Sequence, residues 1–574
     1  MVQPKLPLRN TPLSRLTTNQ LIIFGLGLAV CLLYALYTQR IWEDWFITFR
    51  SSKNLAMGNG LVYQPGERLH TFTSPLGVLI PALLSWLWGS HSDEAVIWSF
   101  RIIGAFFMGG AGILLYRIAK ASFRSWSSVL LVVGLFFLDI KSIDNAINGM
   151  ETAFMLFFTV LFVYAVWSEE HVKWKLSALA LAGLMWTRPD AFIIAGGILA
   201  GYVLFGNKTA PQTYLNRIRK AVMTVVAGGL LYLPWLVFAS VYYGSFIPNT
   251  ILAKGLGASV SPLHLLKRFL AFPIRAFTDP LEYNFLGLIF SPAYSFWGGW
   301  PVYFIVFSKV LSLISVFYWL VPGGRTIGRI TSLGAFMGAS YLGTLVQIPY
   351  PWYIPPVTLL SIVSLAAAYD QLISLGKSRV LQYVGYAAAG VILVTQASIF
   401  AFGAYNGRLQ QQLIEANRKQ VGQWLKANAQ LQETVFLECL GYIGFYSGLK
   451  MYDYPGLSSR EVIDVRKSLI PHHNSLARII NRLHPDWLVL RNLEIGNIKK
   501  ESSVLDSDYA IHKVFSVADQ VRAQPSLPGK GLFLFDQTFT VFHRKTPKQQ
   551  AYKAVRTNAP GDQHRSDAAF TIQD

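Results

Sequence analysis

The chain has 574 residues, of which 53% are hydrophobic and 14% are charged, and its formal net charge is +20. Ordinary soluble domains carry about 25% charged residues, so this composition excludes a purely soluble enzyme and indicates a polytopic membrane protein with a soluble part. Most of the basic residues lie in short loops between apolar runs. Membrane topology therefore explains the positive charge better than a nucleic acid does, and we expect no nucleic-acid partner.

The first apolar run, Leu21–Tyr37, follows a basic segment, as the apolar part of a signal peptide does. The run is too long for that role and no small-residue cleavage site follows it, which favours a retained first helix. It contains Cys31, whereas the other cysteine, Cys439, lies far away in the polar C-terminal part. We expect no disulfide between them, and no Cys/His spacing in the chain is typical of a metal site.

Eleven apolar runs are candidates for membrane-spanning helices, which need about 20 residues to cross the hydrocarbon core. In chain order they are Leu21–Tyr37, Ile102–Tyr116, Ser127–Leu138, Thr152–Trp167, Leu176–Trp186, Ala191–Phe205, Ala221–Tyr243, Trp297–Leu320, Ile330–Gln347, Ile354–Leu375 and Leu381–Gly403. Two further apolar segments, Pro75–Trp88 and Asn284–Pro292, are interpreted as lying in the interface without crossing.

The charge of the loops decides how Pro75–Trp88 is interpreted. If this segment does not cross and the N-terminus is cytoplasmic, the basic loops fall on the cytoplasmic side, as the positive-inside rule requires. These loops are Arg117–Arg124, Ser168–Lys175, Gly206–Lys220, Gly323–Arg329 and Gly376–Arg379. The sequence thus predicts about 11 transmembrane helices in the inner (plasma) membrane, with juxtamembrane helices in the first outer loop.

The remaining polar loops and the C-terminal part then share the outer, periplasmic face. We predict a transmembrane catalytic domain over residues 1–403 and a periplasmic α/β domain over residues 404–546, which is an ordinary domain size. Residues 547–574 are polar and are expected to be disordered.

Four segments of the C-terminal part have recognisable patterns. Leu409–Asn428 is typical of an amphipathic helix. Thr434–Glu438 and Trp487–Leu490 alternate or run apolar as strands do, and Leu532–Phe542 predicts a strand pair that turns near Asp536. These elements indicate the mixed α/β fold.

The stretch from Trp42 to Pro75 concentrates polar side chains directly after the first apolar run. Glu43 and Asp44 lie at the mouth of the helix, where a carboxylate can act as general base for an acceptor hydroxyl. An adjacent pair can also share a proton or a divalent cation, so a metal at Glu43 and Asp44 is left open, and no other cofactor is expected. The alternative is that both residues are solvated at a helix end.

The same stretch holds candidates for binding a phosphate. A short interfacial helix over Trp45–Met57 would place Arg50 and Asn54 on one face, and arginine suits bidentate phosphate contacts. Anchoring to lipid head groups is the alternative for Arg50. The other candidate substrate-binding or phosphate-binding residues are Glu67, His70, Glu151, Arg188, Asp190, Asn249, Lys254 and Tyr353.

Several of these later candidates also have a structural interpretation. Glu151 opens a predicted helix and can stabilise its N-terminus. Arg188 and Asp190 can pair with each other across the proline between them. Tyr353 belongs to an aromatic segment that is also typical of the interfacial belt.

Several motifs in a fixed order resemble those of the GT-C glycosyltransferases, which are polytopic enzymes that use polyprenyl-phosphate sugars. The motifs are the carboxylate pair, FITFR, NLAMGNGLVYQPGER, TSPL, NGMET, RPD and YGSFIPNTILAK, and weaker ones, LGYIGFYSG and YDYPGLS, continue into the C-terminal part. Within this superfamily the chain looks most like the bacterial group that contains the mycobacterial terminal β-(1→2)-arabinofuranosyltransferases. The relatives often have Asp-Asp where this chain has Glu43 and Asp44, so the chain keeps the second carboxylate.

The resemblance implies chemistry on the periplasmic side. A polyprenyl-phosphate sugar donor enters from the bilayer, and Asp44 deprotonates a hydroxyl of a cell-envelope glycan, lipid or protein acceptor. Polyprenyl phosphate then leaves, and Arg50, Arg188 and Lys254 are the candidates for stabilising its charge. No nucleotide is needed, and the chain has no dinucleotide-binding glycine fingerprint.

Two other classes of protein are alternatives. A transporter or flippase of a lipid-linked sugar predicts charges buried in the middle of helices and two pseudo-symmetric halves, whereas the unusual charges cluster at one face and no repeat is visible. A receptor whose working part is the C-terminal domain would not need eleven spans. The transferred sugar, arabinofuranose or another pentose or hexose, is not fixed by the sequence.

Overall fold

The computed structural model describes residues 16–89, 92–167, 174–206, 213–256, 261–292, 294–346, 349–375 and 379–545. The basic segment before the first helix, the predicted tail at 547–574 and parts of three predicted cytoplasmic loops (168–173, 207–212 and 376–378) lie outside the described residues.

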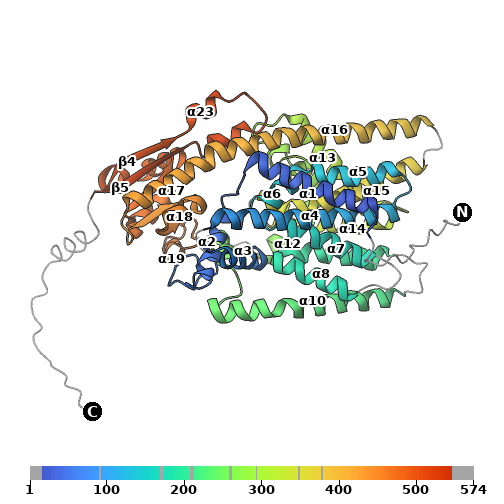
Figure 1. Cartoon of the computed structure of the whole chain (residues 1–574), viewed down its shortest axis with the longest axis horizontal. Helices are drawn as coiled ribbons and strands as arrows, with labels where there is room; N and C mark the ends of the chain where they lie inside the picture. Colours follow the sequence, from blue (N-terminus) through green and yellow to red (C-terminus); the bar gives the residue numbers. More distant parts are fainter. Residues whose placement is uncertain are drawn as a thin grey trace, which may run out of the picture.

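A bundle of helices forms the first part of the chain, and most of its axes run side by side (Figure 1). In chain order the elements are α1 (Thr18–Thr38), α2 (Trp45–Ala56), α3 (Pro75–Trp88), α4 (Asp93–Ser122), α5 (Trp126–Leu138), α6 (Ile140–Ile147), α7 (Thr152–Trp167), α8 (Trp174–Thr187), η1 (Pro189–Ala191), α9 (Phe192–Phe205), α10 (Tyr214–Tyr243), α11 (Asn249–Gly255), α12 (Pro262–Thr278), η2 (Leu281–Tyr283), η3 (Phe285–Leu288), α13 (Val302–Val316), η4 (Tyr318–Leu320), α14 (Thr326–Thr344), η5 (Pro351–Tyr353), α15 (Pro355–Leu375) and α16 (Arg379–Leu409).

Each of the eleven predicted spans falls on one of these helices, namely α1, α4, α5, α7 to α10 and α13 to α16. Among the described residues, six helices are long and apolar enough to cross a membrane, and the bent pair of α5 and α6 would be a seventh. The protein is therefore a multi-pass membrane protein, and the count of eleven stays a prediction. Helix α3 has the predicted bounds, and its 14 residues extend about 21 Å, which is short of the ~30 Å hydrocarbon core.

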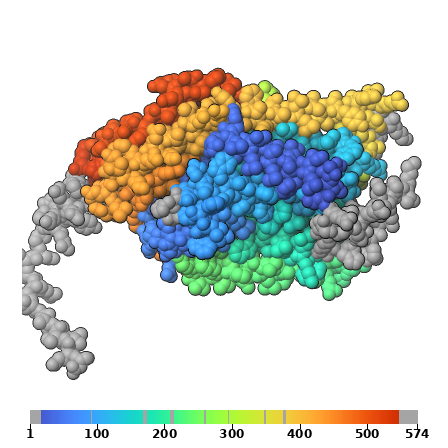
Figure 2. All heavy atoms as spheres, viewed as in Figure 1, coloured from blue at the N-terminus to red at the C-terminus, as the bar shows by residue number. Residues whose placement is uncertain are grey.

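Small residues let the helices of the bundle approach closely, as is common in membranes. A Cβ atom on Gly27 of α1 would lie 2.9 Å from the Cα of Gly109 of α4, and one on Gly201 of α9 would lie 2.8 Å from the Cα of Ile330 of α14. Helices α10 and α16 lie at opposite edges of the bundle and are mostly unburied (Figure 2). Their apolar outer faces are suited to contact with lipid.

The C-terminal domain contains a five-stranded sheet in the order β2-β1-β3-β5-β4. Strands β2, β1 and β3 are parallel, whereas β5 runs antiparallel to both β3 and β4. The elements after α16 are η6 (Gln410–Glu415), α17 (Ala416–Asn428), β1 (Thr434–Leu437), α18 (Leu440–Ser447), β2 (Lys450–Asp453), α19 (Arg460–Ser468), α20 (Leu476–Leu483), β3 (Trp487–Arg491), α21 (Asn492–Glu501), α22 (Val504–Asp508), β4 (Tyr509–Ser516), α23 (Ala518–Ala523), η7 (Lys530–Leu534) and β5 (Thr538–Arg544).

The predicted strands at Thr434–Glu438 and Trp487–Leu490 are confirmed as β1 and β3, but the strand pair predicted over Leu532–Phe542 is wrong. Its first half is the turn η7, and only the second half is a strand. The backbone N–H of Gly531 donates to the carbonyl of Gly298 in the bundle, 3.0 Å away. This contact with the bundle replaces the pairing that the apolar alternation predicted.

One helix joins the bundle to the C-terminal domain without a break. Helix α16, the π-helical turn η6 and α17 form a single helix of 50 residues, Arg379–Asn428. The predicted boundary at residues 403 and 404 lies inside it. The domain therefore extends the bundle at one end, with α2 and α3 close to the junction (Figure 1).

Candidate functional site

Asp44 precedes the first turn of α2 at the junction between the bundle and the C-terminal domain. Helix α2 has the predicted bounds to within one residue, and its aromatic side chains Trp45, Phe46 and Phe49 are buried. The turn after α6 supports this placement, because Gly149 has a φ of 102° and its Cα lies against the Trp45 ring. A Cβ atom at Gly149 would come within 2.4 Å of that ring, so the NGMET motif holds the start of α2 in place.

Two tyrosines from other loops lie close enough to the half-buried Asp44 for its charge to act on them. Burial raises the pKa of Tyr350, and the Asp44 carboxylate raises it further. Burial, Tyr350 and Asp44 raise the pKa of Tyr294 in the same way. These residues come from parts of the chain about 250 and 300 positions after Asp44, and the fold brings them to one carboxylate.

Lys254 of α11 also contacts Tyr350. Its Nζ lies 4.3 Å from the centroid of the Tyr350 ring. No carboxylate of the described ranges forms an ion pair with Lys254, and its charge is held against an aromatic face. The ring of Tyr350 also stacks on Trp352, 4.9 Å away. The structure thus brings together a carboxylate, a cation and an aromatic wall, and we call Asp44, Lys254, Tyr294 and Tyr350 the junction site.

A second cluster surrounds Arg188, at the end of α8. Its guanidinium donates to Asp190 through Nε at 3.0 Å and Nη2 at 2.9 Å, and Nη1 lies 3.3 Å from Glu151 Oε1. The Arg188 Cζ lies 4.0 Å above the Tyr353 ring, and Tyr341 donates to Asp190. The structure therefore brings four predicted candidates together, namely Glu151, Arg188, Asp190 and Tyr353. The Arg188 guanidinium is already paired with the carboxylates of Glu151 and Asp190. The structural pairing is the interpretation that the geometry supports.

Three predicted candidates, Arg50, Asn249 and Glu67, bond the C-terminal domain and so hold it to the bundle. Arg50 Nη1 donates to the Gly444 carbonyl at 2.8 Å, and its Nη2 bonds Gln64 and two further carbonyls of the C-terminal domain. Asn249 donates to the carbonyls of Gly456 and Leu457, and Glu67 pairs with Lys450. The phosphate-binding prediction for Arg50 is therefore not supported, because these carbonyls occupy its donors.

Asn54 shares a helix face with Arg50, as predicted, but its side chain binds the loop that follows α2. Its side-chain amide donates to the carbonyls of Val62 and Tyr63 at 2.8 and 3.0 Å. The Arg50 guanidinium lies 4.4 Å above the Tyr63 ring. This face of α2 therefore holds the loop that follows it.

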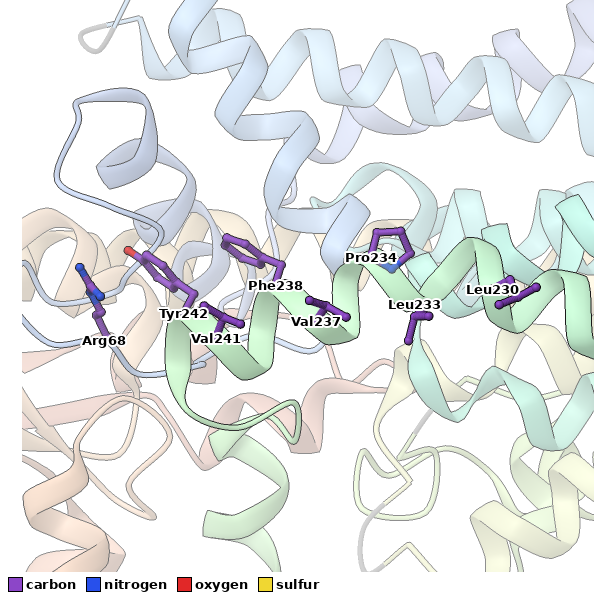
Figure 3. Close-up of a pocket in the computed structure, with 8 residues that line it drawn as sticks. All are labelled: Arg68, Leu230, Leu233, Pro234, Val237, Phe238, Val241 and Tyr242. Carbon is purple, nitrogen blue, oxygen red and sulfur yellow. The ribbon is translucent and has the colours of Figure 1, made fainter.

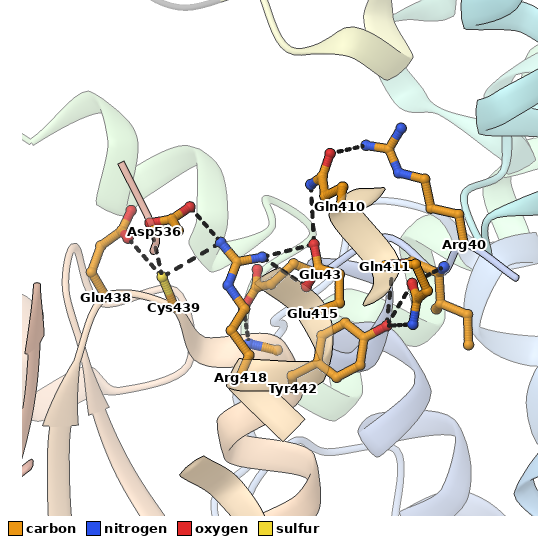
Figure 4. Close-up of polar contacts among 12 residues, drawn as sticks. Arg40, Glu43, Gln410, Gln411, Glu415, Arg418, Glu438, Cys439, Tyr442 and Asp536 are labelled. Carbon is orange, nitrogen blue, oxygen red and sulfur yellow. Dashed lines mark hydrogen bonds and ion pairs between the residues drawn. The ribbon is translucent and has the colours of Figure 1, made fainter. Parts of the chain in front are cut away.

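Glu43 and Asp44 have different surroundings. The Glu43 carboxylate accepts a hydrogen bond from the backbone N–H of Gly441, at the start of α18. Burial and then the Asp44 carboxylate raise the pKa of Glu43 well above its usual range, and Arg418 opposes them. Figure 4 shows Glu43 beside the buried pair of Glu415 and Arg418, whose Nη1 and Oε2 lie 2.8 Å apart. Glu43 therefore faces the C-terminal domain, and we assign it to positioning rather than to proton transfer.

Comparison with solved structures identifies the architecture. The chain superposes on ArnT from Cupriavidus metallidurans in the apo state with a TM-score of 0.51, at 12% identity, covering 92% of this chain and 98% of that one. It superposes on the apo oligosaccharyltransferase of Archaeoglobus fulgidus with a TM-score of 0.52, at 12% identity, covering 82% of this chain and 69% of that one. The chain has the GT-C fold.

Sequence comparison adds a relative and a domain. The chain is 29% identical over 234 residues to the terminal β-(1→2)-arabinofuranosyltransferase of Mycobacterium tuberculosis, covering 38% of this chain and 35% of that protein. The match thus spans about a third of the length of the relative. Residues 405–542 match a family described as a domain of unknown function, DUF8728. The predicted recognition of a GT-C protein is confirmed.

The GT-C bundle also has an apolar groove that the sequence did not predict. The groove has a volume of about 750 Å³ and follows α10 past Leu230, Pro234 and Phe238 (Figure 3). It ends at Arg68, whose Cζ lies 5.0 Å from the centroid of the Tyr242 ring. Arg68 stands in the polar stretch after the first helix, and only the fold shows that it closes an apolar groove.

No cluster of three or more His, Cys, Asp or Glu side chains could hold a metal ion within the ranges that the structure describes. Glu43 and Asp44 therefore belong to no such cluster in the described part of the chain. The charged groups of the junction site are the Asp44 carboxylate and the Lys254 ammonium group.

His70 is a predicted candidate that the fold buries among aromatic rings. Its imidazole stacks on Tyr243 at 4.7 Å and meets Phe72 and Trp235 edge to face. Burial lowers its pKa from 6.5 to about 4. The ring is therefore neutral near pH 7 and supports the loop, and it cannot supply a positive charge for a phosphate there.

This burial predicts a pH dependence of stability. The unfolded chain binds a proton at His70 below pH 6.5, whereas the folded chain binds it only below about pH 4. Protonation of His70 in the unfolded chain therefore leaves the free energy of unfolding unchanged above pH 6.5. It lowers that free energy by up to about 3 kcal/mol as the pH drops to 4. We expect His70→Phe, which keeps a flat ring on Tyr243, to weaken the fall of the melting temperature over this range. Replacing the exposed His264 by Gln should leave it unchanged, and an unaltered His70→Phe profile would contradict the assignment.

Proposed function

We propose that the protein is a membrane glycosyltransferase that moves a sugar from a polyprenyl-phosphate donor to a cell-envelope glycan, lipid or protein on the periplasmic side. The observation that carries the proposal is the meeting of Asp44 and Lys254 at Tyr350, at the end of a GT-C bundle and below a soluble domain. A base and a cation on one aromatic wall are the groups that such a transfer needs.

The proposed reaction is a single displacement. Asp44 takes the proton of an acceptor hydroxyl, and the oxygen forms a bond to the anomeric carbon of the donor. The bond from that carbon to the phosphate oxygen breaks at the same time, and polyprenyl phosphate leaves with its electron pair. Attack opposite the leaving group inverts the anomeric centre. Lys254 balances the charge that develops on the leaving phosphate.

The groove along α10 supports a lipid-linked donor. Its wall is apolar, it lies on a face of the bundle that is suited to lipid, and Arg68 stands at its end. An isoprenoid chain would fill such a groove with its phosphate toward the arginine. Helix α10 leads directly to the loop that carries α11 and Lys254, so the lipid would approach the junction site along one continuous segment.

The sugar that we favour is a pentose, and arabinofuranose is the first to test, because the similar protein of Mycobacterium tuberculosis is named for its transfer. The test is incubation of the purified protein in nanodiscs with synthetic polyprenyl-phosphate pentoses and hexoses and a panel of acceptors. We expect free polyprenyl phosphate and an acceptor that gains one sugar mass. Movement of labelled donor across proteoliposomes without any product would overturn the proposal in favour of a flippase.

Lys254→Ala is expected to lower kcat/KM for the donor by about 10- to 100-fold, because a hydrogen bond to a charged group contributes about 1.5 to 3 kcal/mol and this one strengthens as the phosphate leaves. Lys254→Arg should recover most of the loss, since it keeps the charge. Lys267→Ala, which removes an exposed lysine from the neighbouring helix α12, is the matched control. Equal kcat/KM values for Lys254→Ala and the control would exclude the assigned role.

A further inference from the structure

A second cavity lies in the C-terminal domain, apart from the junction site and the α10 groove. Its volume is about 310 Å³, at the lower end of the range for small-molecule sites. Polar residues from different elements line it, among them Glu438, Asn474, Arg491, Glu494 and Asn497. None of these residues takes part in the proposed displacement.

The cavity occupies the place in the sheet where α/β proteins bind ligands. Glu438 directly follows β1, and Arg491 is the last residue of β3, so both stand at the carboxyl ends of adjacent parallel strands. The chain leaves β1 toward β2 on one side and returns to β3 on the other. Crevices at the carboxyl ends of strands at such a switch point are common ligand sites.

Ion pairs within the protein hold the side chains of the cavity in place before any ligand binds. Arg491 Nη2 lies 2.7 Å from both Glu438 Oε2 and Glu494 Oε1, and its Nη1 donates to Asp536 at 3.0 Å. The guanidinium is thus surrounded by carboxylates and cannot attract a further anion. The Glu438 side chain is still 40% exposed, and its carboxylate has lone pairs left for hydroxyl donors.

The charge of the lining limits the chemistry of a ligand. The lining contains three carboxylates, Glu438, Glu494 and Glu501, and one guanidinium, that of Arg491, whereas Glu501 pairs with Arg478 outside the lining. Such a wall repels phosphates and uronic acids but accepts hydrogen bonds from uncharged hydroxyl groups. The amide of Asn497 can both donate and accept, and that of Asn474 can donate, because its oxygen already accepts from Tyr454 and Arg466.

The loop after β1 links the cavity to the junction site. Glu438 lines the cavity, and the N–H of Gly441, three residues later, donates to Glu43, the neighbour of Asp44. Burial is the main cause of the raised pKa of Tyr350, but the carboxylates of both Asp44 and Glu438 add to it. Glu438 is therefore close enough to act electrostatically on the tyrosine that Lys254 contacts. A chain of sugars held in the cavity would extend toward Asp44.

We propose that the cavity between β1, β3 and α21 binds an uncharged saccharide segment of the acceptor, a short distance from the hydroxyl that receives the new sugar. The inference rests on the proposed function only in that it makes the saccharide a part of the acceptor. Binding of a saccharide in the cavity does not depend on that function. The domain of unknown function would then select the acceptor, and the bundle would supply the donor.

The test uses the full-length protein in nanodiscs and two substitutions at the exposed Asn497. Asn497→Ala removes the amide, and Asn497→Trp fills the cavity. Lys500→Trp, at an exposed position of the same helix outside the lining, is the control. We expect Asn497→Trp to raise the KM for the acceptor about ten-fold or more, as the loss of one or two hydrogen bonds implies, with kcat and donor KM unchanged.

A binding measurement without donor separates this inference from the proposed function. The probes are a neutral tetrasaccharide and a uronic-acid tetrasaccharide of equal length. Binding of the neutral probe that Asn497→Trp abolishes supports the cavity even if no transfer is ever detected. Equal binding of both probes, or transfer whose acceptor KM is the same in Asn497→Trp and the control, would overturn it.

Discussion

Asp44→Asn should lower the rate of sugar transfer by about 10²- to 10⁴-fold, which is the usual contribution of a general base. Asparagine keeps the shape of the side chain, so folding and donor binding should stay within two-fold of the parent. The measurement is kcat and both KM values in nanodiscs. The effect on kcat should dominate, because the proton is transferred only in the reaction.

Glu43→Gln is the matched variant for Asp44→Asn. It removes the neighbouring charge but can still accept the hydrogen bond from the Gly441 N–H, so it should retain most of the activity. Full activity of Asp44→Asn would rule out the general base. Equal losses of activity in Asp44→Asn and Glu43→Gln would assign the role of general base to the pair of carboxylates.

Gly441→Ala is the second substitution from which we expect a large effect. An added Cβ would lie 1.9 Å from the Glu43 carbonyl oxygen and 2.9 Å from its carboxylate, so either α18 or the backbone before Asp44 must move. Overpacking of this kind costs about 1 to 3 kcal/mol. A catalytic group displaced by about 1 Å loses on the order of 100-fold in rate. We therefore expect both a lower melting temperature and a kcat reduced by about 100-fold.

Gly496→Ala provides the comparison for Gly441→Ala. Gly496 lies on α21 of the same domain, and nothing lies within 4 Å of an added Cβ there. Its activity and melting temperature should match the parent or rise slightly, because alanine favours a helix. If Gly441→Ala behaves like Gly496→Ala, the contact between α18 and Glu43 does not position Asp44.

The helices of the bundle were predictable because apolar length is a local property of the sequence. Helix α3 and, to within one residue, α2 have the bounds that the pattern predicts. Polar residues were harder to interpret, because their partners lie far away in the chain. Arg50 has the chemistry of a phosphate ligand, but its main partner is a carbonyl 394 positions later.

The junction site itself was predictable only in part. Asp44 and Lys254 stand out in the sequence, since each belongs to a recognisable motif after an apolar run. Their meeting at Tyr350 depends on how three loops pack, which no local pattern encodes. Arg68 and Glu438 were not predicted for the same reason. They line a groove and a cavity that exist only in the folded chain.

The helix that runs from Arg379 to Asn428 limits how the two parts of the protein can be exchanged by recombination. Insertions and domain exchanges succeed mainly at exposed, flexible segments, and this junction is instead the middle of a helix about 75 Å long. Ile414 and Glu415 are buried just past the junction, and Arg418 follows one turn later. A new C-terminal domain would have to arrive together with α16, so under the proposed function the acceptor and donor preferences would be inherited as one unit.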